Sequence, residues 1–347
     1  MEKHTIYSKL PGALLPWYET YKRDLPWRSD REPYHIWLSE IMLQQTRVEA
    51  VKGYYSRFLK ALPTVEDLAR AEDALLHKLW EGLGYYSRVR NLKKAALCIV
   101  NEYNGIFPNE YEKVLKLPGI GEYTAGAICS IAFDLPTPAV DGNVLRVVSR
   151  LTNDATPIDL PSYKKEVSRH LAEFYPKEAG NFTQALMELG ATVCGPNRKP
   201  DCLSCPCNIF CKAYKANTAE GLPVKLPKRS RTVEDRTVFI LSCDGRYALE
   251  KRPEKGLLAG LWQFPNSLSK MDIPDSLAAV ENMGLRPKEL LRQLDKTHIF
   301  THIQWNMRGV YIEVAEPSGS FTWLTAERIN DTAALPTAFR QFWQEVL

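Results

Sequence analysis

Four cysteines lie close together near the middle of the chain, and their spacing limits what this region can become. They are Cys194, Cys202, Cys205 and Cys211, with seven, two and five residues between them. We expect no secretory signal, and cytosolic thiols stay reduced, so a metal centre explains the group better than disulfides do. Structural zinc usually takes two close cysteine pairs, whereas one close pair flanked by wider gaps suits a [4Fe–4S] cluster. The spacing therefore favours iron–sulfur and leaves zinc as the alternative.

The length and charge of the chain set wide bounds on its class. Its 347 residues leave room for two or three domains. Its apolar runs are shorter than the roughly eighteen residues that span a bilayer. A net charge of +4 gives by itself only weak support for a polyanionic partner. We expect a soluble protein of the cytoplasm without a membrane partner.

The hydrophobic pattern changes near residue 216. Before that point, apolar residues recur at helical spacing between breaks at Pro, Gly or Asn. The predicted helices are 36–45, 48–60, 65–70, 74–82, 87–103, 111–117, 122–133, 143–151, 163–174 and 181–191. Residues 216–235 have no such period, and their composition is typical of a linker.

After the linker, the pattern becomes that of an α+β domain. Two strand-like runs, 237–243 and 246–249, flank Asp244-Gly245, which is a two-residue signal for a tight hairpin. Further elements are expected as a strand at 310–314 and as helices at 275–283 and 287–293. The chain is therefore expected to be multi-domain, with an all-α half followed by an α+β half.

The segment Leu117–Gly126 joins two predicted helices through Gly119 and Gly121. Glycine lets the backbone pass close to a ligand, and the N–H groups at the start of the second helix can bind an anion such as a DNA phosphate. The pattern is that of a helix-hairpin-helix. A plain connection between helices is the alternative, and the cysteine group farther along the chain favours the DNA-binding interpretation.

Glu40 is a candidate general acid. On a helix it shares a face with Ile36, Trp37 and Leu43, which lie three or four positions away. Burial against apolar neighbours disfavours the charged carboxylate and raises its pKa, as an acid working near neutral pH requires. The alternative is an ordinary surface glutamate.

Asp141 stands where a predicted helix begins, before Gly142-Asn143. A helix N-cap is the simplest explanation. A carboxylate at a helix N-terminus is favoured by the helix dipole and amide N–H groups, so we expect a depressed pKa for Asp141. An ionised carboxylate can stabilise an oxocarbenium-like sugar cation. The two interpretations are compatible.

Seven groups of residues, spread over nearly the whole chain, resemble one protein superfamily. They are Leu25–Arg28, Trp37–Thr46, Gly82–Arg88, Leu117–Gly126, Val140–Asn143, the cysteine group and Gly256–Trp262. In these motifs and in their order, the chain resembles the helix-hairpin-helix superfamily of base-excision DNA glycosylases, and within it the MutY family of adenine glycosylases.

The resemblance implies a helical glycosylase region over residues 1–215, a linker at 216–235 and a Nudix-like domain over 236–347. The helical region would comprise a six-helix subdomain at about 30–135 and a cluster subdomain built from 1–29 and 136–215. It further implies a [4Fe–4S] cluster on the four cysteines. The family's first cysteine gap has six residues and this chain has seven, which leaves Cys207 as an alternative ligand.

By the same resemblance, Glu40 protonates N7 of a flipped-out adenine, and Asp141 stabilises the sugar cation by its charge or through a transient adduct. Tyr123 and Asn143 orient these two groups. In related bifunctional glycosylases a lysine occupies the position of Tyr123 and attacks the sugar. Tyrosine cannot form a Schiff base, so we expect a monofunctional enzyme that leaves an abasic site and an intact strand.

The resemblance also assigns contacts with duplex DNA that carries adenine opposite 8-oxoguanine or guanine. The target base must leave the stack, and the gap must be filled. The expected DNA-contacting residues are Arg28, Gln45, Thr46, Leu83, Tyr85, Gly119 and Gly121. Phe300, Thr301 and His302 match the family segment that contacts 8-oxoguanine, where serine usually holds the place of Thr301. We expect a monomer that acts at the nucleoid of a bacterial cytoplasm.

Two other functions remain open on the sequence. A Nudix-type nucleotide hydrolase would need a glutamate-rich box to hold Mg²⁺, and from Gly256 through residue 288 Glu281 is the only glutamate. A non-catalytic lesion binder would keep the hairpin and the cysteine group but should lack the pairing of Glu40 with Asp141. Adenine excision is therefore the function that we expect.

Overall fold

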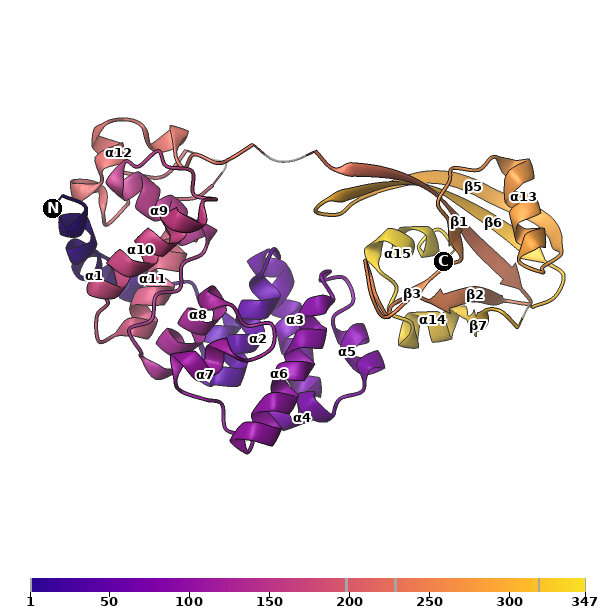
Figure 1. The fold of residues 1–347 in the computed structure, drawn as a ribbon, viewed down its shortest axis with the longest axis horizontal. Coiled ribbons are helices and arrows are strands. Elements are labelled where there is room, and N and C mark those ends of the chain that lie inside the picture. Colours follow the sequence, from indigo (N-terminus) through magenta and orange to yellow (C-terminus); the bar gives the residue numbers. More distant parts are fainter. Residues whose placement is uncertain (1, 197–198, 228–229, 318, 347) are drawn as a thin grey trace. The chain divides into compact units, whose positions relative to one another are not determined.

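The computed structural model describes residues 2–196, 199–227, 230–317 and 319–346. The chain divides into two compact units (Figure 1). The first contains Met1–Arg70 and Asn91–Pro227, and the second contains Ala71–Arg90 and Lys228–Leu347. Residues 197–198 of the first cysteine gap, residues 228–229 of the expected linker, and residues 318 and 347 of the expected C-terminal domain lie outside the described part.

The first unit is helical. Its helices are α1 Glu2–Tyr21, α2 Pro33–Leu43, α3 Val48–Ala61, α4 Val65–Arg70, α7 Tyr111–Leu115, α8 Glu122–Phe133, α9 Gly142–Thr152, α10 Pro161–Glu173, α11 Ala179–Thr192 and α12 Lys212–Lys215, with 3-10 turns η1 Pro26–Arg28, η2 Asn208–Phe210 and η3 Ala219–Gly221. Helix α6, Ser87–Tyr103, runs from the second unit into the first, and α5, Asp73–Leu79, belongs to the second. Each predicted helix before residue 216 is thus confirmed, within a few residues at its ends.

Helix α1 was absent from the predicted helices. It contains Pro11 and Pro16, which interrupt a helical pattern on sequence alone. Its apolar residues nevertheless pack into one core with α9, α11 and the cysteine loop, defined as residues 194–211. The buried members include Leu10, Leu14, Val144, Val148, Phe182, Leu186, Cys207 and Cys211. Burial of this stripe therefore outweighs the local cost of the prolines.

The predicted hairpin connects α7 to α8. Gly119 has φ +76°, and a Cβ added there would lie 2.5 Å from Cβ of Asn91, so only glycine fits without a shift. Gly121 is the N-cap of α8. Helices α2 and α8 contact each other, and both are buried over most of their length. These two helices bring Glu40 and Tyr123 into the interior of the unit.

The second unit contains a mixed sheet of strand order β3-β2-β1-β6-β5, with β4 paired to β1 and β7 paired to β2. Its further elements are β1 Thr232–Cys243, β2 Arg246–Lys251, β3 Trp262–Gln263, β4 Asn266–Ser267, β5 Pro287–Ile299, β6 Ile303–Val314, β7 Thr322–Thr325, α13 Ile273–Asn282, α14 Ala326–Thr332 and α15 Thr337–Trp343. Strands β1 and β6 are parallel, and the other pairs are antiparallel. The predicted β1–β2 hairpin turns at Asp244-Gly245, both with positive φ.

The prediction of a helix at 287–293 was wrong, because this segment forms the start of strand β5. Leucines at 290, 291 and 294 imitate helical spacing, but β5 pairs along the length of β6. From Leu294 to Ile299 its residues alternate between half-buried and exposed, as in a strand that is covered on one face. Long-range pairing therefore decides the structure here.

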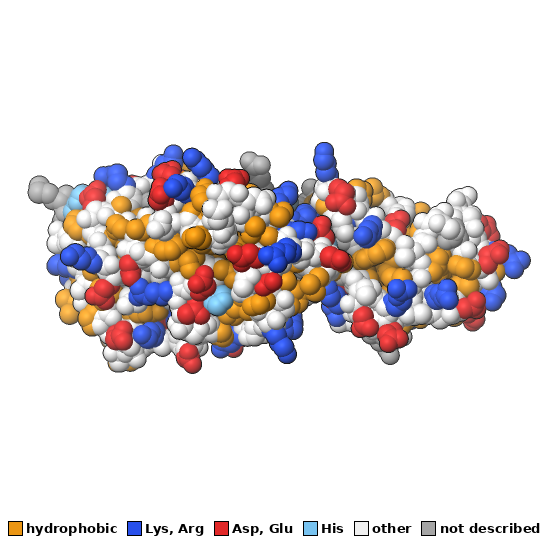
Figure 2. All heavy atoms as spheres, turned by 90° about the horizontal axis from the view of Figure 1, so that it is seen from below, with side chains coloured by type: hydrophobic (Ala, Val, Ile, Leu, Met, Phe, Trp, Pro, Cys, Tyr) orange, Lys and Arg blue, Asp and Glu red, His pale blue; other side chains and the backbone are white. Residues whose placement is uncertain are grey.

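Apolar side chains cover both faces of the sheet. One face packs Phe264, Trp305 and Met307 against α15, and the other packs Phe239 and Val310 against α13. Among the described residues, the helices are all too short or too polar to cross a bilayer. Figure 2 shows basic and acidic side chains interspersed on the face that it draws, in agreement with the small net charge.

Candidate active site and cysteine loop

A cavity of about 660 Å³ in the first unit collects the residues that were predicted to carry out the chemistry. Glu40, Tyr123, Asp141 and Asn143 all line it. They come from α2, the start of α8 and the start of α9. The cavity therefore brings together side chains that are up to about a hundred positions apart in the sequence.

Glu40 is held at the wall of this cavity, and its side chain is 6% exposed. The Tyr123 hydroxyl donates a hydrogen bond of 2.6 Å to Glu40 Oε2. Burial raises the pKa of Glu40 to about 7. The hydrogen bond from Tyr123 opposes this rise. The negative charge of Asp141 raises the pKa of Glu40 further, and the positive charge of Arg28 lowers it. The predicted raised pKa is thus confirmed, and a substantial fraction of Glu40 carries a proton near neutral pH.

Asp141 caps helix α9, as predicted. Its carboxylate accepts hydrogen bonds from the Val144 N–H at 2.8 Å and from Asn143 Nδ2 at 2.6 Å. The predicted depressed pKa was wrong. Burial raises the pKa of Asp141 above its ordinary value, and the capping hydrogen bonds only reduce that rise. Withdrawal from water is a tertiary effect that the local helix-start pattern does not reveal.

Helix α9 also links the cavity to the cysteine loop. Arg146 Nη2 donates to Asn143 Oδ1 at 2.9 Å, and its Nε donates to the Cys194 carbonyl at 2.9 Å. Asn143 in turn donates to Asp141. A continuous series of hydrogen bonds therefore runs from the carboxylate of Asp141 to the backbone of the first cysteine.

The four predicted ligands, Cys194, Cys202, Cys205 and Cys211, line one small space, and Cys207 is not among the residues that line it. Arg150 Nη1 lies 3.3 Å from Cys194 Sγ and can donate a hydrogen bond to it. Four sulfurs around one space, with a cationic donor beside them, suit a thiolate-ligated cluster. Cys207 is fully buried in the neighbouring core, as are Cys129 and Cys243 in theirs.

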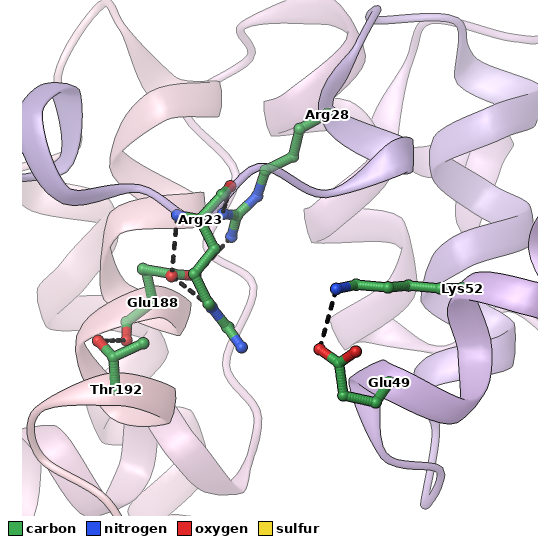
Figure 3. Close-up of polar contacts among 6 residues, drawn as sticks. All are labelled: Arg23, Arg28, Glu49, Lys52, Glu188 and Thr192. Carbon is green, nitrogen blue, oxygen red and sulfur yellow. Dashed lines mark hydrogen bonds and ion pairs between the residues drawn. The ribbon is translucent and has the colours of Figure 1, made fainter.

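Arg23 and Glu188 are among the residues of the cavity that the sequence did not lead us to predict. Glu188 lies on α11 with its side chain fully buried, and Figure 3 shows Arg23 and Arg28 converging on it. Arg23 Nε lies 2.6 Å from Glu188 Oε1, and Arg28 Nη2 lies 2.8 Å from Oε2. Burial alone would raise the pKa of Glu188, but the two guanidinium groups hold it below its ordinary value. The sequence did contain one indication of this site, because Glu188 is the only charged residue in the apolar run 185–189.

The expected DNA-contacting residues fall into two sets. Arg28, Gln45, Thr46, Gly119 and Gly121 line the cavity of the first unit. The second set, in the other unit, consists of Leu83, Tyr85, Phe300, Thr301 and His302.

The second set is built around one hydrogen bond. Tyr85 is 47% exposed, and its hydroxyl lies 2.8 Å from Thr301 Oγ1. Phe300 packs edge-on against Trp305, with ring centroids 4.8 Å apart. Leu83 is buried, so Tyr85 is the side chain of this turn that faces solvent. The predicted turn and the predicted lesion segment therefore lie side by side.

Two family models match the chain. Residues 38–177 match the HhH-GPD superfamily of base excision DNA repair proteins, and residues 236–345 match a NUDIX domain. A structure of a thermostable thymine-DNA glycosylase is 29% identical, with a TM-score of 0.54, over 62% of this chain and 97% of that one. A trapped endonuclease III–DNA covalent intermediate is 26% identical, with a TM-score of 0.52, over 62% of this chain and 98% of that one.

The fold and the cavity thus define a helix-hairpin-helix enzyme of base excision repair. Curated relatives narrow this class. An adenine DNA glycosylase of Arabidopsis thaliana is 37% identical over 88% of this chain and 57% of its own length, so the chain spans little more than half of that relative. Adenine DNA glycosylases of Mus musculus and Homo sapiens are 35% and 34% identical, over 95% and 96% of this chain and 76% and 73% of their own lengths. The chain belongs to the adenine DNA glycosylases, a family of hydrolases of N-glycosyl bonds.

Proposed function

We propose that the protein removes adenine from duplex DNA, where adenine stands opposite 8-oxoguanine or guanine, after flipping the base into the cavity around Glu40. The observation that carries this proposal is the pairing of Glu40 and Asp141 in one cavity of a size suited to a nucleoside. Membership of the adenine DNA glycosylases supports the choice of base.

In the proposed reaction, protonated Glu40 donates its proton to N7 of adenine, which turns the base into a neutral leaving group. The bond between C1′ and N9 then breaks, and its electron pair leaves with adenine. The Asp141 carboxylate stabilises the positive charge that develops on the sugar. Water adds to C1′ and passes a proton to a carboxylate, so the products are free adenine and an abasic site. The Tyr123 hydroxyl and the Asn143 amide orient the two acids.

The purine itself offers ring nitrogens as acceptors and the exocyclic amine as a donor. Arg23 and Arg28 present N–H donors at the cavity wall, and Glu188 presents a carboxylate between them. We infer that these three groups select adenine by its edge. Guanine presents a different pattern of donors and acceptors there, so its edge would make fewer hydrogen bonds with these three groups, which costs binding energy.

The base opposite adenine is assigned to the second unit. Thr301 and His302 offer a hydroxyl and an imidazole to 8-oxoguanine, and Tyr85 beside Thr301 offers an exposed ring that can stack in the duplex. We infer a monomer, acting at the nucleoid of a bacterial cell.

The four cysteines lining one space are the residues that would hold a [4Fe–4S] cluster. Such a cluster supplies a rigid cross-link for the cysteine loop. The loop would in turn fix the series of hydrogen bonds from Cys194 through Arg146 to Asn143.

The proposed function is tested by single-turnover measurements on duplexes that place adenine opposite 8-oxoguanine, guanine or thymine. We expect rapid release of free adenine opposite 8-oxoguanine, slower release opposite guanine and least opposite thymine. Equal rates on all three duplexes would contradict the assignment of the opposite base. Absence of adenine release from a protein that binds these duplexes would contradict the enzymatic assignment and favour a non-catalytic lesion binder.

A further inference from the structure

Glu81 makes a buried polar contact between two distant parts of the second unit. Its side chain is 8% exposed. One carboxylate oxygen, Oε1, accepts the Leu335 N–H at 3.1 Å, and the other, Oε2, lies 3.0 Å from Arg340 Nη1. Oε2 also pairs with Lys78 at 2.8 Å. The Glu81 carboxylate, which follows α5, thus binds both Leu335, just before α15, and Arg340 within α15.

The turn that follows Glu81 is the segment Gly82–Tyr86, which carries the exposed ring of Tyr85. It is rigid from within, because Trp80 Nε1 donates to the Gly84 carbonyl at 3.1 Å and Arg88 Nη2 donates to the Leu83 carbonyl at 3.0 Å. Both Gly82 and Gly84 take positive φ values. The two hydrogen bonds hold the turn in one conformation.

Two further contacts tie this turn to the sheet domain. On the turn itself, the Tyr85 hydroxyl meets Thr301 Oγ1 at 2.8 Å. After the turn, Arg90 Nη1 donates to the Ala259 carbonyl at 2.9 Å. The anchor at Glu81 is more buried than the exposed contact between Tyr85 and Thr301, and it is charge-assisted. Such bonds are stronger than neutral ones, so the contact at Glu81 should hold the turn more firmly than the bond between Tyr85 and Thr301 does.

We propose that Glu81 is a positioning residue that locks the Gly82–Tyr86 turn onto residues 335–340, so that Tyr85 and Thr301 meet the DNA as one preformed element. This inference rests on the proposed function. A preformed element loses little conformational freedom on binding, so its hydrogen bonds to an 8-oxoguanine contribute more fully to discrimination. Glu81 is not among the residues that line the cavity around Glu40. Its loss should therefore change the choice of opposite base and leave the chemical step unchanged.

The test uses the full-length protein with Glu81→Gln, Arg340→Ala and the double variant. Arg340 is 44% exposed, so its loss should leave the fold intact. In each variant we expect the ratio of single-turnover rates opposite 8-oxoguanine and guanine to fall by about fivefold or more, with the rate opposite guanine unchanged. In the double variant the ratio should fall no further than in the more affected single variant, because both substitutions remove the same ion pair between Glu81 and Arg340. Glu345→Ala removes ion pairs with Arg292 and Lys296 in the same unit and serves as the control, with a ratio like that of the native protein.

A second measurement makes the proposal independent of catalysis. Hydrogen exchange should be faster in Glu81→Gln than in the native protein both at residues 82–88 and at residues 299–303, and Glu345→Ala should leave both segments unchanged. Unchanged exchange and an unchanged ratio in a folded Glu81→Gln would overturn the proposal. If the native protein released no adenine, the proposed function would fail, and the exchange experiment would still decide whether Glu81 locks the turn.

Discussion

The Tyr123 hydroxyl donates its hydrogen bond to Glu40, the carboxyl group that the proposed reaction needs in its protonated form. A donor of this kind stabilises the carboxylate and so lowers the pKa of Glu40, whereas burial raises this pKa by a larger amount. The balance of the two leaves the pKa of Glu40 at about 7. In the proposed mechanism, Tyr123 therefore influences the pH range of the acid as well as its orientation.

Replacing Tyr123 by phenylalanine should move this pH range. Without the hydrogen bond, the pKa of Glu40 rises above its value of about 7 in the native protein. In the proposed reaction the protonated acid is the active form, so the fall in excision rate at alkaline pH should begin at a higher pH in Tyr123→Phe. The measurement is the single-turnover rate against pH, with Tyr175→Phe, whose hydroxyl bonds to Thr183, as the control. A shift of the fall to lower pH would show that another group is the acid.

Glu40→Gln should remove activity and add stability. Loss of a general acid costs about 10²- to 10⁴-fold in rate, whereas DNA binding should be retained. The pKa of Glu40 is raised in the folded protein, so its contribution to stability is complete below about pH 4.5 and is lost as the pH rises through about 7. At pH 8 the native protein buries a carboxylate where the variant buries a neutral amide. Denaturant unfolding should therefore show the variant more stable by up to about 3 kcal/mol at pH 8, with little difference at pH 4.

Glu49→Gln is the matched control for this variant, because Glu49 is exposed and pairs with Lys52 on the same helix (Figure 3). It should change neither the excision rate nor the stability beyond the small value of a surface pair. Full activity in Glu40→Gln would sink the proposed mechanism. Equal stability of Glu40→Gln and the native protein at pH 8 would show that Glu40 is not held in a desolvated site.

Local patterns in the sequence predicted those features of the site that depend on neighbouring residues. The spacing of Ile36 and Trp37 around Glu40 predicted a buried acid, and the residues after Asp141 predicted an N-cap. The pKa of Asp141 escaped prediction because it depends on burial by distant helices. Glu188 escaped for the same reason, since its partner Arg23 is 165 positions away.

The fold shows the same division between local and distant causes. The β1–β2 hairpin follows from Asp244-Gly245 alone. Strand β5 was mistaken for a helix because its pairing with β6 has no local signature. Helix α1 was missed because Pro11 and Pro16 conceal a stripe whose value lies in packing against α9 and α11. Contacts between residues far apart in the sequence, in the core and in the cavity, could be recognised only in the structure.

Substitutions in the cysteine loop should distinguish the cysteines that bind the metal from the one that only packs in the core. Cys202→Ala should lose the brown chromophore and most of the bound iron, because Cys202 lines the space shared by the four predicted ligands. Cys207→Ala should keep both, because Cys207 is not among the residues that line that space. Iron content per chain and the visible absorption spectrum measure the difference. Loss of iron from Cys207→Ala would show that Cys207 is a ligand. A colourless native protein that contains one zinc ion per chain would show that the four cysteines bind zinc and not an iron–sulfur cluster.

The last prediction concerns the fate of the DNA strand. A phenol at position 123 cannot form an imine with the sugar, so the enzyme should release adenine and leave the strand intact. Lys164 also lines the cavity, where its ammonium lies 3.8 Å from the carboxylate of Glu122. Borohydride added during turnover reduces any imine to a stable protein–DNA adduct, and we expect none above the level of a heat-inactivated control. An adduct that disappears in Lys164→Ala would identify that amine as the nucleophile and make the enzyme bifunctional, whereas an absence of adduct in both proteins would exclude an imine and support base release without strand cleavage.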